Sequence, residues 1–152
     1  MPISAPAMST SKRTLTAALE AGDLQAAVAA LRQDIVFHSP ILATVGDEVS
    51  GLPTLAKILQ TAFTGLGMPQ NVEEFHSPDG RYIVTFDGAI DGNLIQIAML
   101  VTEDAQGKVE SLRGFMRPWP VVKLFREYME RNLRPGLVPD ALWELPASKA
   151  RH

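Results

Sequence analysis

The spacing of hydrophobic positions changes once along the chain, near Asn71. Before that residue apolar side chains mostly recur three and four positions apart, which is typical of amphipathic helices. After it they alternate with polar side chains, which is typical of strands with one buried face. The change predicts a helix-rich first half and a β-sheet in the second half.

In the first half the pattern predicts a short helix from Leu15 that ends at Gly22, and a second helix that Asp23 caps and that extends to Leu31. Pro53 opens a third helix, which has the clearest apolar stripe of the chain and ends before Gly65. Between the second and third helices we expect an edge strand and a polar loop, over residues 35–41 and 46–51.

Turn residues divide the second half into an antiparallel meander. The runs Pro78–Gly80, Asp91–Gly92 and Asp104–Gly107 separate four predicted strands, near 71–77, 82–90, 93–102 and 108–116. Pro118 ends the last strand, and apolar spacing from Val121 predicts a final helix up to residue 132.

A two-residue turn at Asp91–Gly92 would fix the register, because residues whose numbers sum to 183 then lie opposite each other. One face of the sheet is then almost entirely apolar and must be covered by helices, which predicts an apolar pocket. An even-numbered turn at Asp79–Gly80 would add Phe75 to this face, beside Val84, and place His76 on the other face. That second face is mixed, with Ile83 among polar neighbours, and suits a two-fold dimer contact.

Composition narrows the classes of partner. The 152 residues carry a formal net charge of -3, so no broad basic surface exists for nucleic acid. The chain has no cysteine, and its longest apolar runs fall far short of a membrane span. Residues 1–12 have no signal-peptide pattern and are predicted to be a disordered leader. We therefore expect a cytoplasmic protein with no cofactor, no nucleic-acid partner and no membrane partner.

Several local sequences are similar to one family in their order along the chain. These are Glu20-Ala21-Gly22-Asp23-Leu24, Val36-Phe37-His38-Ser39-Pro40, Gly51 before the third helix, and Gly107-Lys108-Val109 leading to Phe115-Met116-Arg117-Pro118. Over residues 14–131 the chain resembles the SnoaL-like branch of the nuclear transport factor 2-like superfamily. The resemblance implies an α+β, cone-shaped fold, in which a curved antiparallel sheet packs on N-terminal helices and a C-terminal helix closes the pocket. The domain would span residues 13–132, with an extended tail over 133–152.

The same resemblance implies that known catalytic groups are missing. Ketosteroid isomerases of the superfamily use a carboxylate, a tyrosine and a protonated aspartate, and the positions that match them here are Ser39, Leu15 and Met99. Related epoxide hydrolases and cyclases use an aspartate on the last strand, where this chain has Gly114. The superfamily also contains proteins without any chemistry, so the fold carries over and the activity does not.

Three polar side chains remain as catalytic candidates. His38 could move protons near an apolar pocket at neutral pH, or it could be a half-exposed strand histidine whose parity is opposite to that of Phe37. Ser39 and Tyr82 could each orient a ligand by one hydrogen bond, although Tyr82 could equally be a core aromatic residue.

A second group of polar residues falls outside the predicted pocket. His76 with Asp87 could form a dyad, but on the outer face, where a dimer or surface role is favoured. No metal site is expected from His38, His76 and Asp87, because the predicted register places them on different faces.

We therefore expect a protein that binds a small apolar or aromatic molecule and that need not catalyse a reaction. The alternatives are an isomerase, polyketide cyclase or epoxide hydrolase-like enzyme built around His38, and a non-catalytic interaction module. The predicted ligand-binding residues are Phe37, Phe63, Phe75, Val84, Phe86, Ile97, Met99, Leu112, Gly114, Met116 and Trp119.

Overall fold

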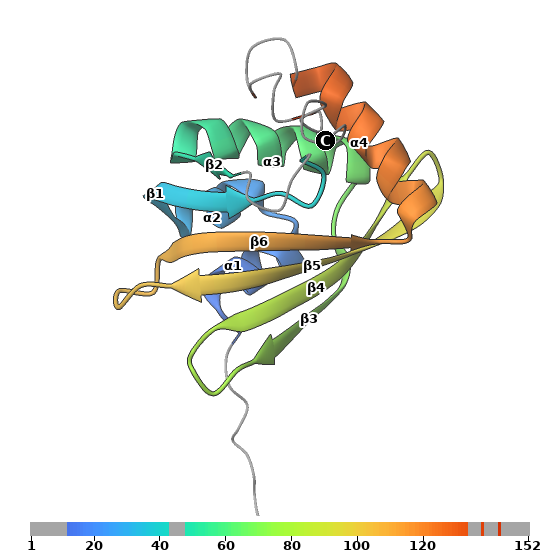
Figure 1. The fold of residues 1–152 in the computed structure, drawn as a ribbon. Coiled ribbons are helices and arrows are strands. Elements are labelled where there is room, and N and C mark those ends of the chain that lie inside the picture. Colours follow the sequence, from blue (N-terminus) through green and yellow to red (C-terminus); the bar gives the residue numbers. More distant parts are fainter. Residues whose placement is uncertain (1–11, 43–47, 134–137, 139–142, 144–152) are drawn as a thin grey trace, which may run out of the picture.

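The computed structural model describes residues 12–42, 48–133, 138 and 143. A curved sheet lies against helices on its inner side, and a last helix crosses its upper end (Figure 1). This arrangement confirms the predicted α+β fold class. The elements in chain order are α1 (Thr14–Ala21), α2 (Leu24–Ala29), β1 (Leu31–His38), β2 (Val49–Ser50), α3 (Leu52–Leu66), β3 (Gln70–His76), β4 (Tyr82–Ile90), β5 (Asn93–Glu103), β6 (Val109–Arg117) and α4 (Trp119–Leu133).

The junction between α1 and α2 forms as the sequence predicts. Gly22 has a φ of 68°, a left-handed conformation that suits glycine, and its N–H donates to the Leu19 carbonyl at 3.1 Å. The Asp23 side chain accepts a hydrogen bond from the Ala26 N–H at 3.0 Å and caps α2. The second helix is shorter than expected, since it ends at Ala29 and Leu31 already belongs to β1.

The sheet is six-stranded, in the order β2-β1-β6-β5-β4-β3. It is mixed rather than purely antiparallel, because β1 runs parallel to its neighbour β6. The predicted polar loop over 46–51 contains the short strand β2, which pairs with β1 through Phe37 and Val49. The first strand therefore lies inside the sheet and not at its edge.

The register between β4 and β5 agrees with the prediction. Tyr82 pairs with Val101 and Ile90 pairs with Asn93, so the residue numbers of each pair sum to 183. The turn residues Asp91 and Gly92 have φ angles of 50° and 79°, which is the geometry of a two-residue type I′ hairpin.

The predicted register between β3 and β4 is wrong by one residue. Phe75 pairs with Ile83 and His76 pairs with Tyr82. The hairpin loop has an odd number of residues: the Ser77 N–H donates to the Arg81 carbonyl at 2.9 Å, and the left-handed residue Gly80 supplies the bulge of a three-residue loop. One extra loop residue reverses the parity of the whole strand.

This shift moves two predicted residues to the opposite faces. Phe75 lies on the outer, convex face with 52% of its surface exposed, and so it is not part of the pocket. His76 lies on the inner side, where its ring centroid is 5.7 Å from that of Tyr82. His76 and Asp87 are therefore on different faces, and the predicted dyad does not form.

The inner, concave face of the sheet forms one core with α3 and α4. Leu55, Ile58 and Leu59 of α3 are buried, as are Val122, Phe125 and Met129 of α4. Val138 and Trp143, which were predicted to belong to an extended tail, are only 2% exposed and join this core. The leader predicted over residues 1–12 lies, except for Lys12, outside the described residues. No helix among the described residues is long and apolar enough to cross a membrane, and the cytoplasmic location stays a prediction.

Candidate functional site

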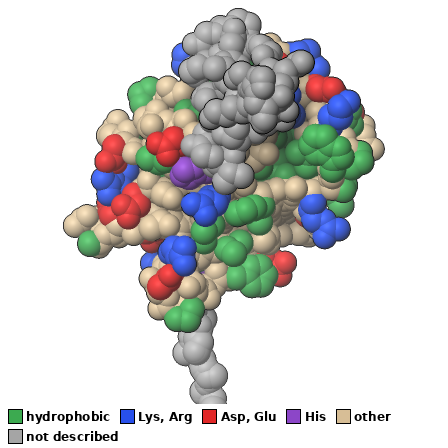
Figure 2. Space-filling model, in the orientation of Figure 1, with side chains coloured by type: hydrophobic (Ala, Val, Ile, Leu, Met, Phe, Trp, Pro, Cys, Tyr) green, Lys and Arg blue, Asp and Glu red, His purple; other side chains and the backbone are tan. Residues whose placement is uncertain are grey.

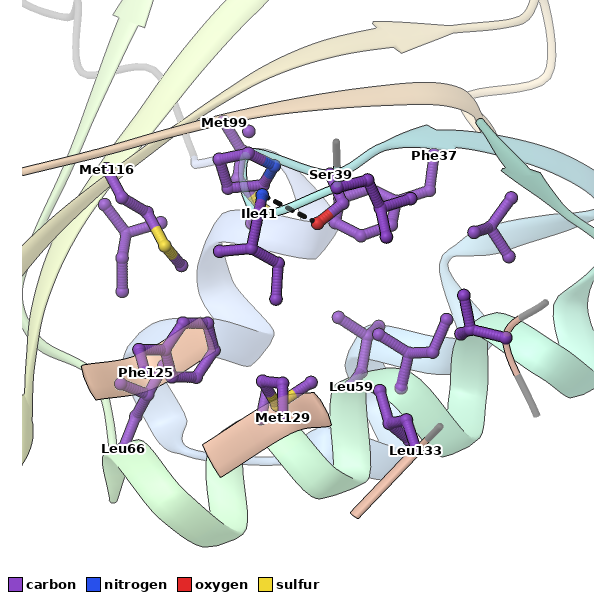
Figure 3. Close-up of a pocket in the computed structure, with 18 of the residues that line it drawn as sticks. Phe37, Ser39, Ile41, Leu59, Leu66, Met99, Met116, Phe125, Met129 and Leu133 are labelled. Carbon is purple, nitrogen blue, oxygen red and sulfur yellow. Dashed lines mark hydrogen bonds between the residues drawn. The ribbon is translucent and has the colours of Figure 1, made fainter. Parts of the chain in front are cut away.

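A cavity of about 60 Å³ lies between the concave face of the sheet and the helices α3 and α4. Met99 and Met116 reach into it from β5 and β6, and Phe125, Met129 and Leu133 face them from α4 (Figure 3). The described residues that line it are Phe37, Ser39, Pro40, Ile41, Leu42, Val49, Ile58, Leu59, Ala62, Phe63, Leu66, Phe86, Ile97, Met99, Gly114, Met116, Phe125, Met129, Leu133, Val138 and Trp143.

The chemistry of this wall is almost wholly apolar. Within the described part of the chain, Ser39 is the one lining residue with a hydroxyl group, and no lining side chain is an acid, a histidine, a lysine or an arginine. The Ser39 Oγ accepts a hydrogen bond from the Ile41 N–H at 3.2 Å (Figure 3). Ser39 thus shapes the turn after β1 and keeps its own hydroxyl hydrogen to offer to a ligand.

Gly114 is the position at which the family resemblance implied a catalytic aspartate in other enzymes, and the structure gives a steric reason for the glycine. A Cβ added to Gly114 would lie 2.8 Å from the Cδ and 3.3 Å from the Cγ of Pro40. Carbon atoms do not approach so closely without a shift of one partner. The proline ring thus occupies the space that an inward side chain of β6 would need.

The structure places seven of the predicted ligand-binding residues, and Ser39, in the wall of this cavity. The seven are Phe37, Phe63, Phe86, Ile97, Met99, Gly114 and Met116. Val84 and Leu112 are buried on the same face of the sheet, at 0% and 1% exposure, but do not line the cavity. Trp119 is 66% exposed and does not line it either. Trp119 is the first residue of α4, and the buried stripe of that helix begins one turn later at Val122.

His38 lies away from the cavity. It pairs with Arg113 of β6, and its Nε2 lies 3.8 Å from the Oε2 of Glu48. Its side chain is 25% exposed. The parity that makes Phe37 face the pocket turns His38 to the opposite side of the sheet, and His38 is not among the described residues that line the cavity.

Tyr82 is a core residue that does not line the cavity. It is 1% exposed, and its hydroxyl donates a hydrogen bond to the Glu103 carboxylate at 3.0 Å. Burial of the ring and the negative charge of Glu103 raise the pKa of the tyrosine far above its ordinary value. The Tyr82 phenol therefore stays protonated and holds the Glu103 carboxylate of β5 in place by its hydrogen bond.

A buried carboxylate beside Tyr82 ties α1 to the sheet. Glu74 accepts a hydrogen bond from the Arg13 N–H at 3.0 Å, and its second oxygen lies 2.6 Å from the His76 Nε2. Burial raises the pKa of Glu74, but the nearby Thr16 hydroxyl and the contacts with the Arg13 N–H and His76 outweigh it and lower the pKa overall. This cluster is held by internal contacts and lies outside the cavity wall.

Sequence patterns missed the contribution of the residues after α4. Val138 and Trp143 line the cavity, yet they stand in a proline-rich stretch without helical or strand periodicity. The only signal was their hydrophobicity, which does not indicate a direction. Among the described residues, no group of three or more His, Asp and Glu side chains could hold a metal ion.

Comparisons with known proteins support the fold. No family model matches the chain, and no curated protein matches it. An uncharacterised protein with a cystatin-like fold from Silicibacter pomeroyi is similar with a TM-score of 0.67 and 16% identity, over 81% of this chain and 84% of that one. A steroid delta-isomerase from Pseudomonas aeruginosa gives a TM-score of 0.63 and 23% identity, over 78% and 85%.

A third similar structure carries the name of the fold. It is a nuclear transport factor 2-like protein of unknown function from Cytophaga hutchinsonii, with a TM-score of 0.54 and 17% identity, over 76% of this chain and 99% of that one. Identities this low show a common fold and leave the activity open.

Proposed function

We propose that this protein, a chain with the nuclear transport factor 2-like fold, binds a small uncharged apolar or aromatic molecule in its cone-shaped pocket. The observation that carries the proposal is the composition of the wall, in which the Ser39 hydroxyl and the Trp143 indole N–H are the only polar side-chain groups among the described lining residues. An enclosed site lined mainly by hydrophobic groups with very few polar ones is the usual form of a small-molecule site.

The same wall argues for an uncharged ligand. An ion moved from water into apolar surroundings loses its hydration, and several kcal/mol of penalty remain unless a counter-charge is present. None of the described side chains that line the cavity carries a charge, and Ser39 offers a hydrogen-bond donor. A neutral molecule with at most one or two polar atoms fits this chemistry best.

Acid–base catalysis has less support in this pocket. General acid–base chemistry needs a titratable side chain within hydrogen-bond reach of the reacting atoms. His38 was the main candidate, and it faces away from the cavity. Tyr82 donates its hydroxyl hydrogen to Glu103, and the hydrogen bond of Ser39 to the described residues is with the Ile41 N–H, which is not a base.

Titration with N-phenyl-1-naphthylamine tests the proposal, because this uncharged dye becomes fluorescent in apolar sites. We expect saturable binding of one dye per chain at micromolar concentration. Ala62→Phe adds a ring to the cavity wall and should weaken binding at least tenfold, whereas Gln60→Phe adds the same ring on the exposed side of α3 and should leave it unchanged. Equal binding by the two variants, or no saturable binding by the native chain, would contradict the proposal.

We also propose that two copies associate through the convex face of the sheet. Large hydrophobic side chains are exposed there, with Phe75 at 52%, Leu94 at 58% and Phe115 at 53%. Figure 2 shows hydrophobic side chains at the surface of this face, with basic and acidic side chains among them. Several large exposed apolar side chains on one face are a feature of surfaces that bind another protein.

The charges on this face are arranged for a two-fold contact. Arg113 and Arg117 lie on β6 at one side, and Glu73 and Asp87 lie on β3 and β4 at the other. When two such sheets stack about a two-fold axis parallel to the strands, β6 of one copy faces β3 of the other. Basic side chains then meet acidic ones on both sides of the apolar centre.

Light scattering tests the dimer. At about 50 µM we expect twice the chain mass for the native protein and the single mass for Phe115→Glu, which replaces one of the large exposed apolar side chains of the face by a charge. Trp119→Glu changes an exposed aromatic residue outside that face and should remain a dimer. A monomer mass for the native protein refutes this part of the proposal.

A further inference from the structure

The cavity is too small for the ligand that its wall suits. Sites for small organic molecules usually enclose about 300–1,000 Å³. The cavity between β5, β6, α3 and α4 holds about 60 Å³, which is room for no more than a few water molecules. A ligand of even two rings therefore requires that some side chain leave the site.

Most of the wall belongs to paired strands and packed helices. Met99 and Ile97 belong to β5, which has paired strands on both sides, and Phe125 and Met129 lie on the buried stripe of α4. Val138 and Trp143 are different, because they follow α4 and belong to neither the sheet nor the helices that frame the cavity. The indole of Trp143 is the largest side chain in the wall, and it is 2% exposed.

Among the described residues, Arg126 is the side chain that hydrogen-bonds to the backbone of Trp143. The Arg126 guanidinium donates from Nη2 to the Trp143 carbonyl and from Nε to the Ile41 carbonyl at 3.0 Å. Its Cζ also lies 5.5 Å from the centroid of the indole ring. Arg126 comes from α4 and does not line the cavity, so it holds Trp143 in place from outside the cavity.

The indole itself is imperfectly accommodated. Its Nε1 is buried and has no hydrogen-bond partner among the described residues. A buried donor without an acceptor gives up its hydration and gains nothing in return. Departure of Trp143 to the surface would restore that hydrogen bond with water, which lowers the cost of exchanging the indole for another apolar group.

We propose that Trp143 occupies the ligand's own place, so that binding displaces this indole from the pocket. The proposal rests on the proposed function and adds to it the size and shape of the ligand: an uncharged, apolar molecule of about two fused rings. Arg126 sets how readily the site opens, because the displaced state loses its contacts to the Trp143 carbonyl and ring. The apparent affinity for the ligand then equals the affinity of the open state multiplied by the fraction of molecules that are open.

Tryptophan fluorescence tests the displacement directly, because the chain has two tryptophans and Trp119 is exposed. In a Trp119→Phe protein, Trp143 is the only tryptophan, and excitation selective for tryptophan reports on it without the two tyrosines. We would add decahydro-2-naphthol, an uncharged two-ring alcohol without absorption in this range, and measure its binding by calorimetry. The account predicts a shift of the Trp143 emission to longer wavelength at saturation and at least a threefold rise in quenching by acrylamide.

Calorimetry with variants gives the second readout. Trp143→Ala should bind decahydro-2-naphthol at least tenfold more tightly than the native chain, and Arg126→Gln should bind it a few-fold more tightly, while Trp119→Ala serves as the matched control without change. Binding by Trp143→Ala alone would overturn the displacement, because the substitution itself leaves an apolar cavity that can hold the alcohol.

The two proposals fail differently. Binding by the native chain with equal or weaker affinity in Trp143→Ala, or with an unchanged Trp143 emission, would overturn the displacement and leave the pocket function standing. Absence of binding in the native chain and in every variant would overturn both. The fluorescence readout keeps Trp143 intact, so it decides the question even if the alanine variant does not fold.

Discussion

Substitution of Gly114 by alanine is expected to destabilise the fold through one contact. The added Cβ would lie 2.8 Å from the Cδ of Pro40, well inside the 3.5–4.0 Å at which carbon atoms attract each other. The strand β6 is paired on both sides, with β1 and β5, so its backbone has little freedom to move away. The proline ring, or the turn that carries it, must shift instead.

The size of the effect follows from two opposing contributions. Forcing one extra methyl group into a packed site costs about 1–3 kcal/mol. Replacement of a glycine by alanine also restricts the unfolded chain, which favours folding by about 0.4–1 kcal/mol where the backbone is compatible. Gly114 has no left-handed φ, so this second contribution applies. The net loss in free energy of unfolding is about 1–2 kcal/mol.

A double-mutant cycle isolates the contact. Pro40→Ala removes the two ring carbons that the new Cβ would meet, so Gly114→Ala should cost at least 1 kcal/mol less in that background, as measured by urea unfolding. Gly114→Asp should cost more than Gly114→Ala, since it adds a buried carboxyl group to the same overlap. Additive effects of the two alanine substitutions, or a Gly114→Ala protein as stable as the native one, would refute the explanation of why this position is glycine.

Three further results are expected. Tyr82→Phe should lower the free energy of unfolding by about 1–2 kcal/mol in urea, because Glu103 loses its hydroxyl partner in a site where its side chain is 10% exposed; a loss under about 0.5 kcal/mol would contradict this. The pKa of Glu74 is lowered in the folded state, so the ionised carboxylate stabilises the fold above the ordinary pKa of glutamate, and this stabilisation is lost as the pH falls below that value. The free energy of unfolding of Glu74→Gln should therefore fall less steeply than that of the native protein between about pH 5 and 3. An equally steep fall in both proteins would exclude this role. His38→Ala should bind N-phenyl-1-naphthylamine within about twofold of the native affinity, because the imidazole lies outside the cavity wall, and a large loss would reopen its candidacy.

The sequence was sufficient where local turn chemistry determines structure. Asp91-Gly92 is a strong signal for a two-residue hairpin. Once that turn is assumed, the sum of paired residue numbers gives the register of β4 and β5 and predicts the apolar face around Phe86 and Met99. Pro78-Asp79-Gly80 is compatible with loops of different length. The three-residue form of that turn could not be chosen from residue types, and Phe75 was therefore assigned to the wrong face.

Contacts between distant parts of the chain were harder to predict. The parallel pairing of β1 with β6 joins residues such as Phe37 and Leu112, and no local signal encodes it. Burial of Trp143 depends on Arg126, 17 positions away, and on the loop carbonyl of Ile41. The pocket wall on the sheet was thus predictable from alternation, whereas its closure by residues after α4 was not.

Methyl-labelled methionine gives the most direct test of the pocket as a binding site. The chain has six methionines; Met99, Met116 and Met129 line the cavity, and Met68 is 55% exposed outside it. Nuclear magnetic resonance spectra of a [13C-methyl]methionine protein, titrated with N-phenyl-1-naphthylamine, would show which methyl groups sense the bound rings. The account predicts saturable shifts at Met99, Met116 and Met129 with Met68 unchanged; shifts confined to Met68, or no shift at the three cavity methionines, would contradict it.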